Sequence, residues 1–397
     1  MIDLIVLKYV FWISLFIIIY SIIGYPIVLY IIVQIKRLIK GKREFDEKTL
    51  LTSRVSLVIP CYNEASILPM KIENSLQLDY PKELMDIVIV ADGSTDNTPE
   101  VVELYKRKGH NITLFHNNIR AGKSAAINRV INEINTPITI CTDANTILND
   151  QSIKEIVRQF LDPKVGCVCG EKRVKQEEGD LASSGEGAYW KYESFLKKLD
   201  SELTSVMGGA GELIAFRTEL YPQIPHKMIL DDFFISMKIL MKGFRVAYEP
   251  KAYASEDSSA SVREEMKRKI RISAGGFQII FTLLPLLNIF KYGWVTFQYV
   301  SHRVLRWLFV PFALPVIYII SLYLSLTDHF LYAILFAGQT LMYSIAVTVH
   351  LVKKYWTPSK LMMLPYYYAM MNYCAILGFW RFLLGNQSSV WEKAIRK

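Results

Sequence analysis

The stretch DIVIVADGSTDNTPE, residues 86–100, contains the pattern that decides the fold. Its short apolar run, 86–91, is rich in β-branched residues and is typical of a buried strand. A polar loop, 92–96, follows the run directly. Thr98 and Pro99 then stand at positions that are typical of a helix N-cap and first turn. A strand, a loop and a helix are therefore expected in immediate succession.

The same alternation continues on both sides of this stretch. Further strands are expected at 55–60, 112–116, 137–142 and 165–170, and further helices at 65–77, 123–134 and 151–161. Alternating strands and helices predict an α/β fold with a doubly wound, mostly parallel sheet. In such sheets ligands bind beyond the carboxyl ends of the strands.

Three loops at these strand ends carry acidic side chains, namely Glu64, Asp92 with Asp96, and Asp143. A single Asp after a strand is commonly a turn residue or a helix cap. Three acidic loops at one sheet edge instead predict a site. Because clustered carboxylates repel one another, they also indicate a bound cation.

Two segments partly match common nucleotide-binding signatures. Gly122-Lys123-Ser124 resembles the end of a P-loop, but Asn117 stands where a glycine is required. Gly209-Ala210-Gly211 begins like a dinucleotide fingerprint, but Ile214 takes the place of the third glycine. Any mononucleotide site in this chain is therefore of another type.

Apolar blocks flank the α/β region. Hydrophobic residues make up 52% of the 397 residues although 21% are charged, so the apolar residues should be concentrated in a few segments. Residues 4–35 hold one charge and are long enough for a single tilted span, kinked near Gly24-Tyr25-Pro26. Basic residues at 36–43 place that end on the cytoplasmic side and the N-terminus outside.

The C-terminal region is expected to hold two or three spans. Residues 304–326 and 330–352 predict a hairpin, because only 327–329 separates them. The block 361–384 either crosses the membrane or is re-entrant or interfacial. The first arrangement leaves a basic tail outside, whereas the second keeps it inside, as the distribution of positive charge favours.

Residues 277–297 are interrupted by a proline and two polar residues, which favours an interfacial helix over a span. The predicted organisation is an α/β domain inserted between membrane helices. Its parts are an N-terminal transmembrane helix at 1–40, a cytosolic domain at 51–275, an interfacial helix at 276–300, and a C-terminal membrane region at 301–397.

The net charge of +9 fits a membrane protein. Basic residues cluster at 36–43 and 263–271, beside the apolar blocks, where anionic lipid headgroups attract them. A nucleic-acid-binding protein is not expected, because no basic face carries interleaved stacking aromatics. Five scattered cysteines exclude a disulfide scaffold. The composition favours a bacterial plasma membrane.

Taken in order, these motifs resemble glycosyltransferase family 2, in its membrane-embedded branch with the cellulose, chitin, hyaluronan and poly-N-acetylglucosamine synthases. The resemblance covers about residues 55–275 and extends to the membrane layout. It implies an A-type glycosyltransferase domain that binds a UDP-sugar and inverts the anomeric centre. It also implies a growing polysaccharide or a lipid-linked molecule as the acceptor.

The donor site implied by the resemblance draws on three loops. The PxYNE loop, 60–64, would hold the nucleoside with Tyr62 against uracil, and Asp92 would accept a hydrogen bond from that ring. The GKxxAxN segment, 122–128, would bring Lys123 to the nucleotide. The substrate-binding residues expected on this basis are Tyr62, Asn63, Glu64, Asp92, Lys123, Asn128 and Asp231.

The metal site implied by the resemblance is Asp143-Ala144-Asn145, at the position of the DxD motif that binds Mg²⁺ or Mn²⁺ across the diphosphate. The expected ligands are Asp143 and Asn145. Because an amide oxygen carries less charge than a carboxylate, we expect a lower metal affinity than for DxD.

Leu230-Asp231-Asp232 resembles the TED motif, whose Asp is the general base. Partial deprotonation of the acceptor hydroxyl by Asp232 would lower the barrier to attack on the sugar's C1. In-line attack opposite the departing UDP gives inversion. The alternative is that both aspartates only add charge to the first turn of the following helix.

The QxxRW position of the family polymerases reads Arg268-Lys269-Ile270-Arg271-Ile272 here. Arg268 and Arg271 can still neutralise the leaving diphosphate. Ile272 replaces the Trp that stacks beneath the acceptor, which puts processive polymerisation in doubt. Tyr189, Trp190 and Tyr192 are either sugar-stacking faces or helix packing.

Three functions stay open. The first two are a polymerase and an enzyme that adds one sugar to a lipid carrier or membrane glycan. The third is an inactive transferase-like scaffold or export partner, which the replacements at Asn145 and Ile272 would favour. Membrane lipids, a second copy of the chain and an export protein are possible partners.

Overall fold

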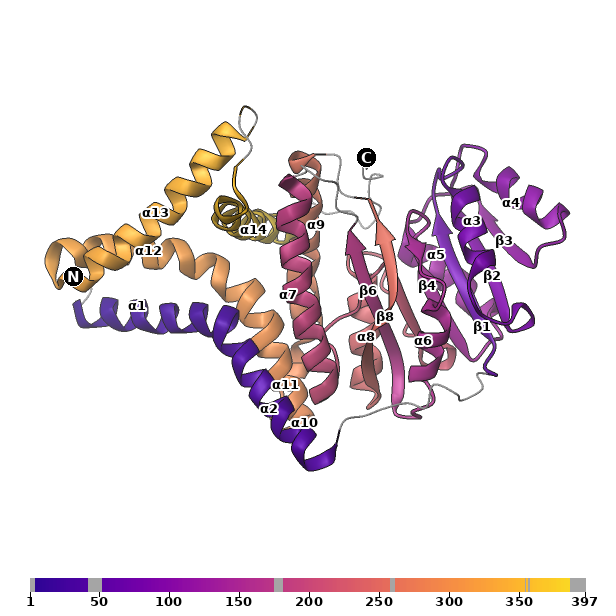
Figure 1. The fold of residues 1–397 in the computed structure, drawn as a ribbon, viewed down its shortest axis with the longest axis horizontal. Helices are drawn as coiled ribbons and strands as arrows, with labels where there is room; N and C mark the ends of the chain where they lie inside the picture. The colour runs from indigo at the N-terminus through magenta and orange to yellow at the C-terminus, as the bar shows by residue number, and fades with distance from the viewer. Residues whose placement is uncertain are drawn as a thin grey trace.

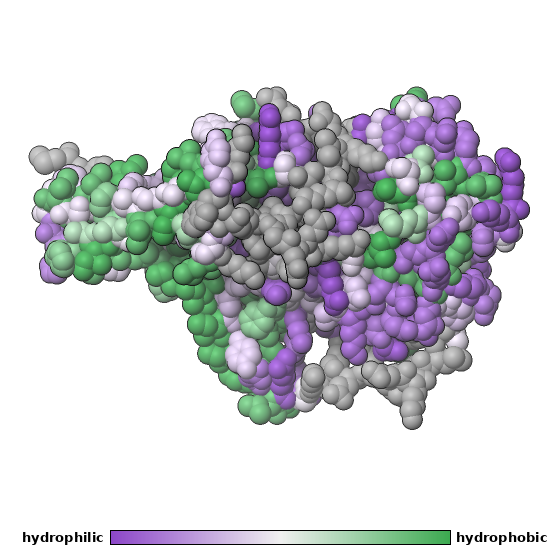
Figure 2. All heavy atoms as spheres, turned by 45° about the horizontal axis from the view of Figure 1, so that its top comes forward, coloured by the Kyte–Doolittle hydropathy of each residue, from purple (hydrophilic) through white to green (hydrophobic). Residues whose placement is uncertain are grey.

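The computed structural model describes residues 4–41, 52–174, 181–257, 261–353, 355 and 358–385. The chain forms an α/β part around one sheet and a helical part that extends away from it (Figure 1). Apolar residues gather over the helical part, whereas hydrophilic residues cover the α/β part (Figure 2). The expected basic tail lies outside the described residues.

The sheet has eight strands in the order β3-β2-β1-β4-β7-β6-β8-β5. They are β1 (Val55–Cys61), β2 (Met85–Asp92), β3 (Ile112–Asn117), β4 (Ile138–Thr142), β5 (Ile147–Leu148), β6 (Val165–Val174), β7 (Leu213–Arg217) and β8 (Arg245–Glu256). Strands β3, β2, β1 and β4 run parallel, as does the pair β6 and β8. Strand β7 is antiparallel to both β4 and β6, and β5 is antiparallel to β8. The predicted fold class is confirmed, but β5, β7 and β8 were not predicted.

Successive residues of β1 enter two different cores. Leu57 and Ile59 belong to the buried apolar core on one face of the sheet, whereas Val58 belongs to the core on the other face. Because side chains alternate between the faces of a strand and both faces are covered, the strand is an almost continuous apolar run. The helices are α3 (Leu68–Gln77), α4 (Thr98–Arg107), α5 (Lys123–Val130), α6 (Ser152–Gln159), α7 (Leu181–Leu203), α8 (Asp231–Met241) and α9 (Val262–Thr282).

Among the described residues, three helical stretches are long and apolar enough to cross a membrane: Leu4–Lys40, Trp294–Thr327 and Phe330–Val352. The first contains α1 (Leu4–Ile19), a π-helical turn (Tyr20–Gly24) and α2 (Tyr25–Lys40). The second contains α11 (Trp294–Tyr299), a π-helical segment (Val300–Phe309) and α12 (Val310–Thr327), and the third is α13. The predicted hairpin is α12 and α13.

The first stretch bends between α1 and α2 (Figure 1). The π-helical turn ends at Gly24, which is the first residue of the expected kink at Gly24-Tyr25-Pro26. Proline cannot donate a backbone hydrogen bond to the preceding turn, which loosens the helix there. The expectation of one kinked helix is therefore confirmed.

Residues 277–297 do not form the single helix that was expected. They are divided among the end of α9, a 3₁₀ turn (Leu284–Leu287), α10 (Ile289–Tyr292) and the start of α11. Pro285 lies in the 3₁₀ turn, and the Asn288 side chain accepts from the Lys291 backbone N–H at 3.2 Å, which starts a new helix. The second stretch therefore begins at Trp294 rather than at residue 304.

A buried polar network joins the helical part to α7. The Asp200 carboxylate accepts from the Tyr25 hydroxyl at 2.5 Å and lies 2.5 Å from His302 Nδ1. The Glu193 carboxylate lies 2.7 Å from the Arg303 guanidinium. All five side chains are titratable, and all five are buried. Such groups are tolerated inside a protein when they are paired, and removing one partner is costly.

The last apolar block forms α14 (Lys360–Leu383), which packs along α9 at a glycine. A β-carbon at Gly378 would lie 2.5 Å from the Ser273 β-carbon and 2.9 Å from the Ile270 carbonyl oxygen. Such distances force the two helices apart. Gly378 therefore sets how closely α14 and α9 approach.

Replacing Gly378 by Ala is expected to destabilise the protein by about 1–3 kcal/mol, because overpacking displaces backbone. Thermal unfolding of the full chain in detergent micelles measures the change. Gly338 on α13 is the matched control, because its β-carbon would have nothing within 4 Å. Gly338→Ala should leave the melting temperature unchanged or raise it. Equal melting temperatures for the two variants would contradict the close approach.

Candidate active site

The loops that follow β1 and β2 form one hydrogen-bonded unit. The Asn63 side chain accepts from the Thr95 backbone N–H at 2.8 Å, and the Asp96 carboxylate accepts from the Ala65 N–H at 3.0 Å. Asn63 has a φ of 54°, a left-handed conformation that asparagine tolerates better than most residues. Asparagine at this position therefore shapes the loop that also carries Tyr62 and Glu64.

The ring of Tyr62, expected to face uracil, is covered by an arginine. The Arg120 guanidinium carbon lies 3.7 Å from the ring centroid, close enough for a cation–π contact. Arg120 was not predicted, because it belongs to no motif that the sequence displays. Its loop approaches Gly93 so closely that a β-carbon there would lie 2.4 Å from the Arg120 backbone nitrogen. The Asp-Gly-Ser turn therefore requires this glycine.

Asp92, expected to contact the nucleobase, holds the start of α5. Its Oδ2 accepts from the backbone N–H groups of Ala121 at 2.9 Å and Gly122 at 2.6 Å, and its Oδ1 lies 3.3 Å from the Arg129 guanidinium. The buried carboxylate thus positions the segment that carries Lys123.

Lys123 lies where three expected site residues converge. Its Nζ donates to Asp143 Oδ1 at 2.6 Å and to the Gly211 carbonyl at 3.1 Å. A β-carbon at Gly211 would lie 3.5 Å from Lys123 Nζ and 3.6 Å from Asp232 Oδ2. Burial disfavours the charged form of Lys123, but the carboxylates of Asp143, Asp231 and Asp232 outweigh it and raise its pKa. The Lys123 ammonium group therefore offsets the negative charge of several carboxylates.

Asp231 and Asp232 begin α8, where the helix dipole favours negative charge. Burial, and next the adjacent charge of Asp231, raise the pKa of Asp232 to about 7, although Lys123 opposes them. Burial also raises the pKa of Asp143 in spite of its contact with Lys123. A carboxylate with a pKa near neutrality can take up a proton under working conditions.

The two arginines of α9 differ in their surroundings. Arg271 lies near the acids: burial lowers its pKa, and the charges of Asp231 and Asp143 oppose that change. The Arg268 guanidinium instead lies 3.5 Å from Glu256 and 3.2 Å from Glu265. Arg268, expected beside the diphosphate, is thus engaged by two carboxylates.

Asn128 holds the loop before α8. Its Oδ1 accepts from the Tyr221 hydroxyl at 2.7 Å and from the Ile224 N–H at 3.0 Å, and its Nδ2 donates to the Ile224 carbonyl at 2.8 Å. These bonds use the side chain to support the chain that leads to Asp231 and Asp232.

Trp190 and Tyr192 of α7 make contacts within the protein. The Trp190 ring lies 5.0 Å from the Lys172 ammonium and 5.6 Å from that of Lys197. The Tyr192 hydroxyl donates to the Ile22 carbonyl at 2.7 Å. The helix-packing alternative therefore describes these rings in this structure.

Two charged groups near the site were missed. Glu212 follows Gly211 and pairs with Lys172; burial opposes its ionisation, but Lys172 lowers its pKa. Lys71 is fully buried and donates to the Thr146 carbonyl at 2.8 Å and the Thr142 hydroxyl at 3.1 Å. Burial lowers the pKa of Lys71 to about 7. Lys71 therefore stabilises the turn that contains Asp143. The only sequence signal near Glu212 was the incomplete glycine fingerprint that precedes it.

The expected metal ligands fit a cation that is shared with a diphosphate. No group of three or more His, Cys, Asp or Glu side chains in the described part of the chain is placed to hold a metal by itself. Asp143 and Asn145 offer a carboxylate and an amide oxygen, the hard donors that Mg²⁺ prefers. Mg²⁺ commonly binds one or two protein groups together with substrate phosphates. Asp143 and Asn145 therefore stay the predicted metal ligands.

Two curated proteins are similar to this chain in sequence. Poly-β-1,6-N-acetyl-D-glucosamine synthase of Staphylococcus epidermidis is 25% identical over 230 residues, which are 57% of this chain and 55% of that protein. The Staphylococcus aureus (strain COL) synthase is 27% identical over 231 residues, again 57% and 55% of the two chains. The chain spans about half the length of the curated relatives it matches.

A solved structure shares the fold over most of the chain. The mannosyltransferase PcManGT from Pyrobaculum calidifontis, in complex with GDP-Man and Mn²⁺, superimposes with a TM-score of 0.69 at 22% identity. The match covers 95% of this chain and 100% of that one. The family model described as glycosyltransferase like family 2 matches residues 53–275, more than half of the chain. The protein therefore belongs to glycosyltransferase-like family 2.

Proposed function

We propose that the protein transfers a sugar from a UDP-sugar to a growing polysaccharide or a lipid-linked acceptor at the cytoplasmic face of the membrane. The observation that carries this proposal is the convergence of Lys123, Asp143 and Asp232 around Gly211. Two relatives named as polysaccharide synthases support a polysaccharide acceptor. The three candidate membrane helices support a membrane location.

In this proposal the nucleoside binds against the loops that carry Tyr62, Asn63 and Glu64. Arg120 either leaves the Tyr62 ring or stacks on the incoming base. Asp92 keeps its hydrogen bonds to the start of α5 and so keeps Lys123 in place. Lys123 then exchanges Asp143 for a phosphate oxygen of the donor, while Asn128 supports the opposite loop.

Asp143 and Asn145 would hold Mg²⁺ or Mn²⁺, and the Mn²⁺ in the mannosyltransferase neighbour supports a divalent cation. Such a cation would neutralise charge on the leaving UDP. Arg271 would supply a guanidinium that is close enough to Asp143 and Asp231 to feel their charge. Because Arg268 is engaged by Glu256 and Glu265, its contribution would be secondary to that of Arg271.

Asp232 acts as the general base. The acceptor hydroxyl gives its proton to the Asp232 carboxylate while its oxygen bonds to the sugar's C1. The bond from C1 to the UDP oxygen breaks on the opposite face, so the anomeric centre inverts. A pKa of about 7 makes Asp232 basic enough to accept that proton, and it leaves about half of the carboxyl groups ionised at neutral pH.

Transfer is expected to accelerate as the pH rises through about 7, because only unprotonated Asp232 can accept a proton. Replacing Asp231 by Asn removes the like charge that helps to raise this pKa. The acidic limb of the rate profile should then move to lower pH. Initial rates of UDP release across the neutral range measure both effects. An acidic limb that stays in place in the Asp231→Asn variant would contradict this coupling.

A screen of UDP-sugars for UDP release, with and without Mn²⁺, tests the function directly. Mass spectrometry of the products then separates a polymer from a single added sugar. An inactive scaffold predicts no UDP release with any donor and no metal-dependent binding of UDP. We also propose that the domain expected at 51–275 faces the cytoplasm and that a second copy or an export protein assists a polymerase.

A further inference from the structure

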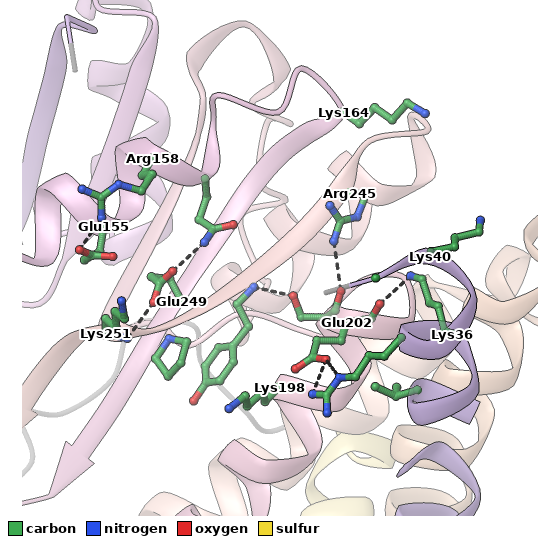
Figure 3. A pocket seen from close by; sticks show the side chains of 17 residues that line it. Lys36, Lys40, Glu155, Arg158, Lys164, Lys198, Glu202, Arg245, Glu249 and Lys251 are labelled. Carbon is green, nitrogen blue, oxygen red and sulfur yellow. Dashed lines mark hydrogen bonds and ion pairs between the residues drawn. The ribbon is translucent and has the colours of Figure 1, made fainter. Parts of the chain in front are cut away.

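A cavity of about 980 Å³ lies apart from the candidate active site (Figure 3). It is formed where the end of α2 meets α6, α7 and β8. None of its lining residues belongs to the cluster around Lys123. Its volume is in the range of sites that hold small ligands, about 300–1,000 Å³.

The cavity is strongly basic. Eight basic and three acidic side chains line it. The acidic groups already have partners: Glu202 lies 2.6 Å from Arg37, Glu155 lies 2.6 Å from Arg158, and Glu249 accepts from the Gln159 amide at 2.6 Å. The positive charge is therefore in excess, which suits an anion.

Three lysines supply most of the uncompensated charge. Lys40 ends α2, Lys164 precedes β6, and Lys198 lies on α7, so the three lysines line the cavity from separate elements, and the side chains of Lys40 and Lys164 extend toward its outer edge (Figure 3). All three side chains are exposed, and none has a carboxylate partner among the residues that the structure describes. Ammonium groups from several directions can surround a phosphate.

The cavity lies where a candidate membrane helix ends. The stretch Leu4–Lys40 terminates in it, with Lys36, Arg37 and Lys40 in the lining. Lys36 Nζ donates to the carbonyl oxygens of Glu202 and Leu203, at 2.6 and 2.7 Å, which fixes α2 to the end of α7. An occupant would therefore contact a membrane helix and the catalytic part together.

We propose that this cavity binds the phosphate of an anionic phospholipid headgroup. The basic end of a membrane helix lies at headgroup depth, where anionic lipids are concentrated. A soluble phosphorylated molecule would meet the same charges, so phosphate recognition is common to both sources. The position at the end of Leu4–Lys40 favours the lipid.

The test compares two triple variants of the full chain. The variant K40Q/K164Q/K198Q removes three charges from the cavity. The variant K106Q/R107Q/K108Q removes three exposed charges at the end of α4, on the far side of the sheet (Figure 1). The two variants have the same net charge, so a difference between them reports the site. Thermal unfolding of both checks that they fold.

Short-chain fluorescent phosphatidylglycerol is titrated into each protein in neutral detergent, with phosphatidylcholine and inorganic pyrophosphate as further arms. A basic residue near anionic lipid strengthens binding about fivefold, so we expect the cavity variant to bind phosphatidylglycerol on the order of a hundredfold more weakly. The wild type and the α4 variant should bind it alike and discriminate against phosphatidylcholine.

Equal affinities of the two triple variants for phosphatidylglycerol would overturn the proposal. Pyrophosphate binding that needs the three lysines, without such lipid binding, would overturn the lipid assignment in favour of a soluble anion. This readout measures binding alone. It can therefore fail or succeed independently of sugar transfer.

Discussion

Replacing Asp232 by Asn is expected to slow sugar transfer by about 10²- to 10⁴-fold, the usual contribution of a general base. The amide has nearly the shape of the carboxylate but cannot accept the acceptor's proton. UDP binding should be retained, because Lys123 and the loops around Tyr62 are unchanged. Rates of UDP release and calorimetric titration with UDP measure the two properties separately.

The neighbouring residue provides the control for this experiment. Asp231→Asn removes a carboxylate from the same turn of α8, and it is expected to shift the pH profile while keeping most of the activity at high pH. Full turnover by purified Asp232→Asn would remove Asp232 from the role of base. Equal losses in both variants would indicate instead that the turn needs negative charge.

Replacing Asp143 by Ala is expected to abolish Mn²⁺-dependent binding of UDP. Removing the charged ligand of a cation that contributes several kcal/mol should lower the transfer rate on the order of 10²- to 10³-fold. Lys123 also loses its partner at 2.6 Å, so its ammonium becomes available to phosphate without metal. Residual UDP binding should therefore become independent of Mn²⁺.

A second substitution adds a carboxylate at the other expected metal ligand, Asn145. Asn145→Asp restores a second carboxylate and is expected to lower the Mn²⁺ concentration that half-saturates the rate, because ligand charge raises the affinity for hard cations. Asn135→Asp, at an exposed position, adds the same charge elsewhere and should leave this concentration unchanged. If neither substitution changes the dependence of the rate on Mn²⁺, Asp143 and Asn145 are excluded as the metal ligands.

The parallel half of the sheet could be predicted from the sequence because its strands are buried on both faces. VSLVIPC in β1 and MDIVIVAD in β2 are apolar almost throughout, which distinguishes them from loops. Strand β8 mixes charged and apolar residues over RVAYEPKAYASE, and its register shifts along β6, so no regular pattern identified it. Strands β5 and β7 are too short to show a hydrophobic pattern that would identify them as strands.

The site was predictable where side chains stand at the ends of such strands. Asp143 and Asp232 meet at Lys123 because strand order and the start of α8 bring them there. The partners of Arg268 were not predictable, because Glu256 lies at the end of an unpredicted strand. Arg120 and Lys71 act through contacts between distant segments, which sequence spacing does not encode.

The buried network of Asp200, Glu193 and His302 has a practical consequence for protein production. A gene fragment that ends at residue 275, where the family match ends, would lack His302 and Arg303. The buried carboxylates of Asp200 and Glu193 would then lose these basic partners. The fragment would also lack Ile279 and Tyr299, which belong to the apolar core beneath α8. The family-matched region, 53–275, therefore depends on later residues for part of its core, and a fragment that ends at 275 should aggregate where the chain of 397 residues purifies.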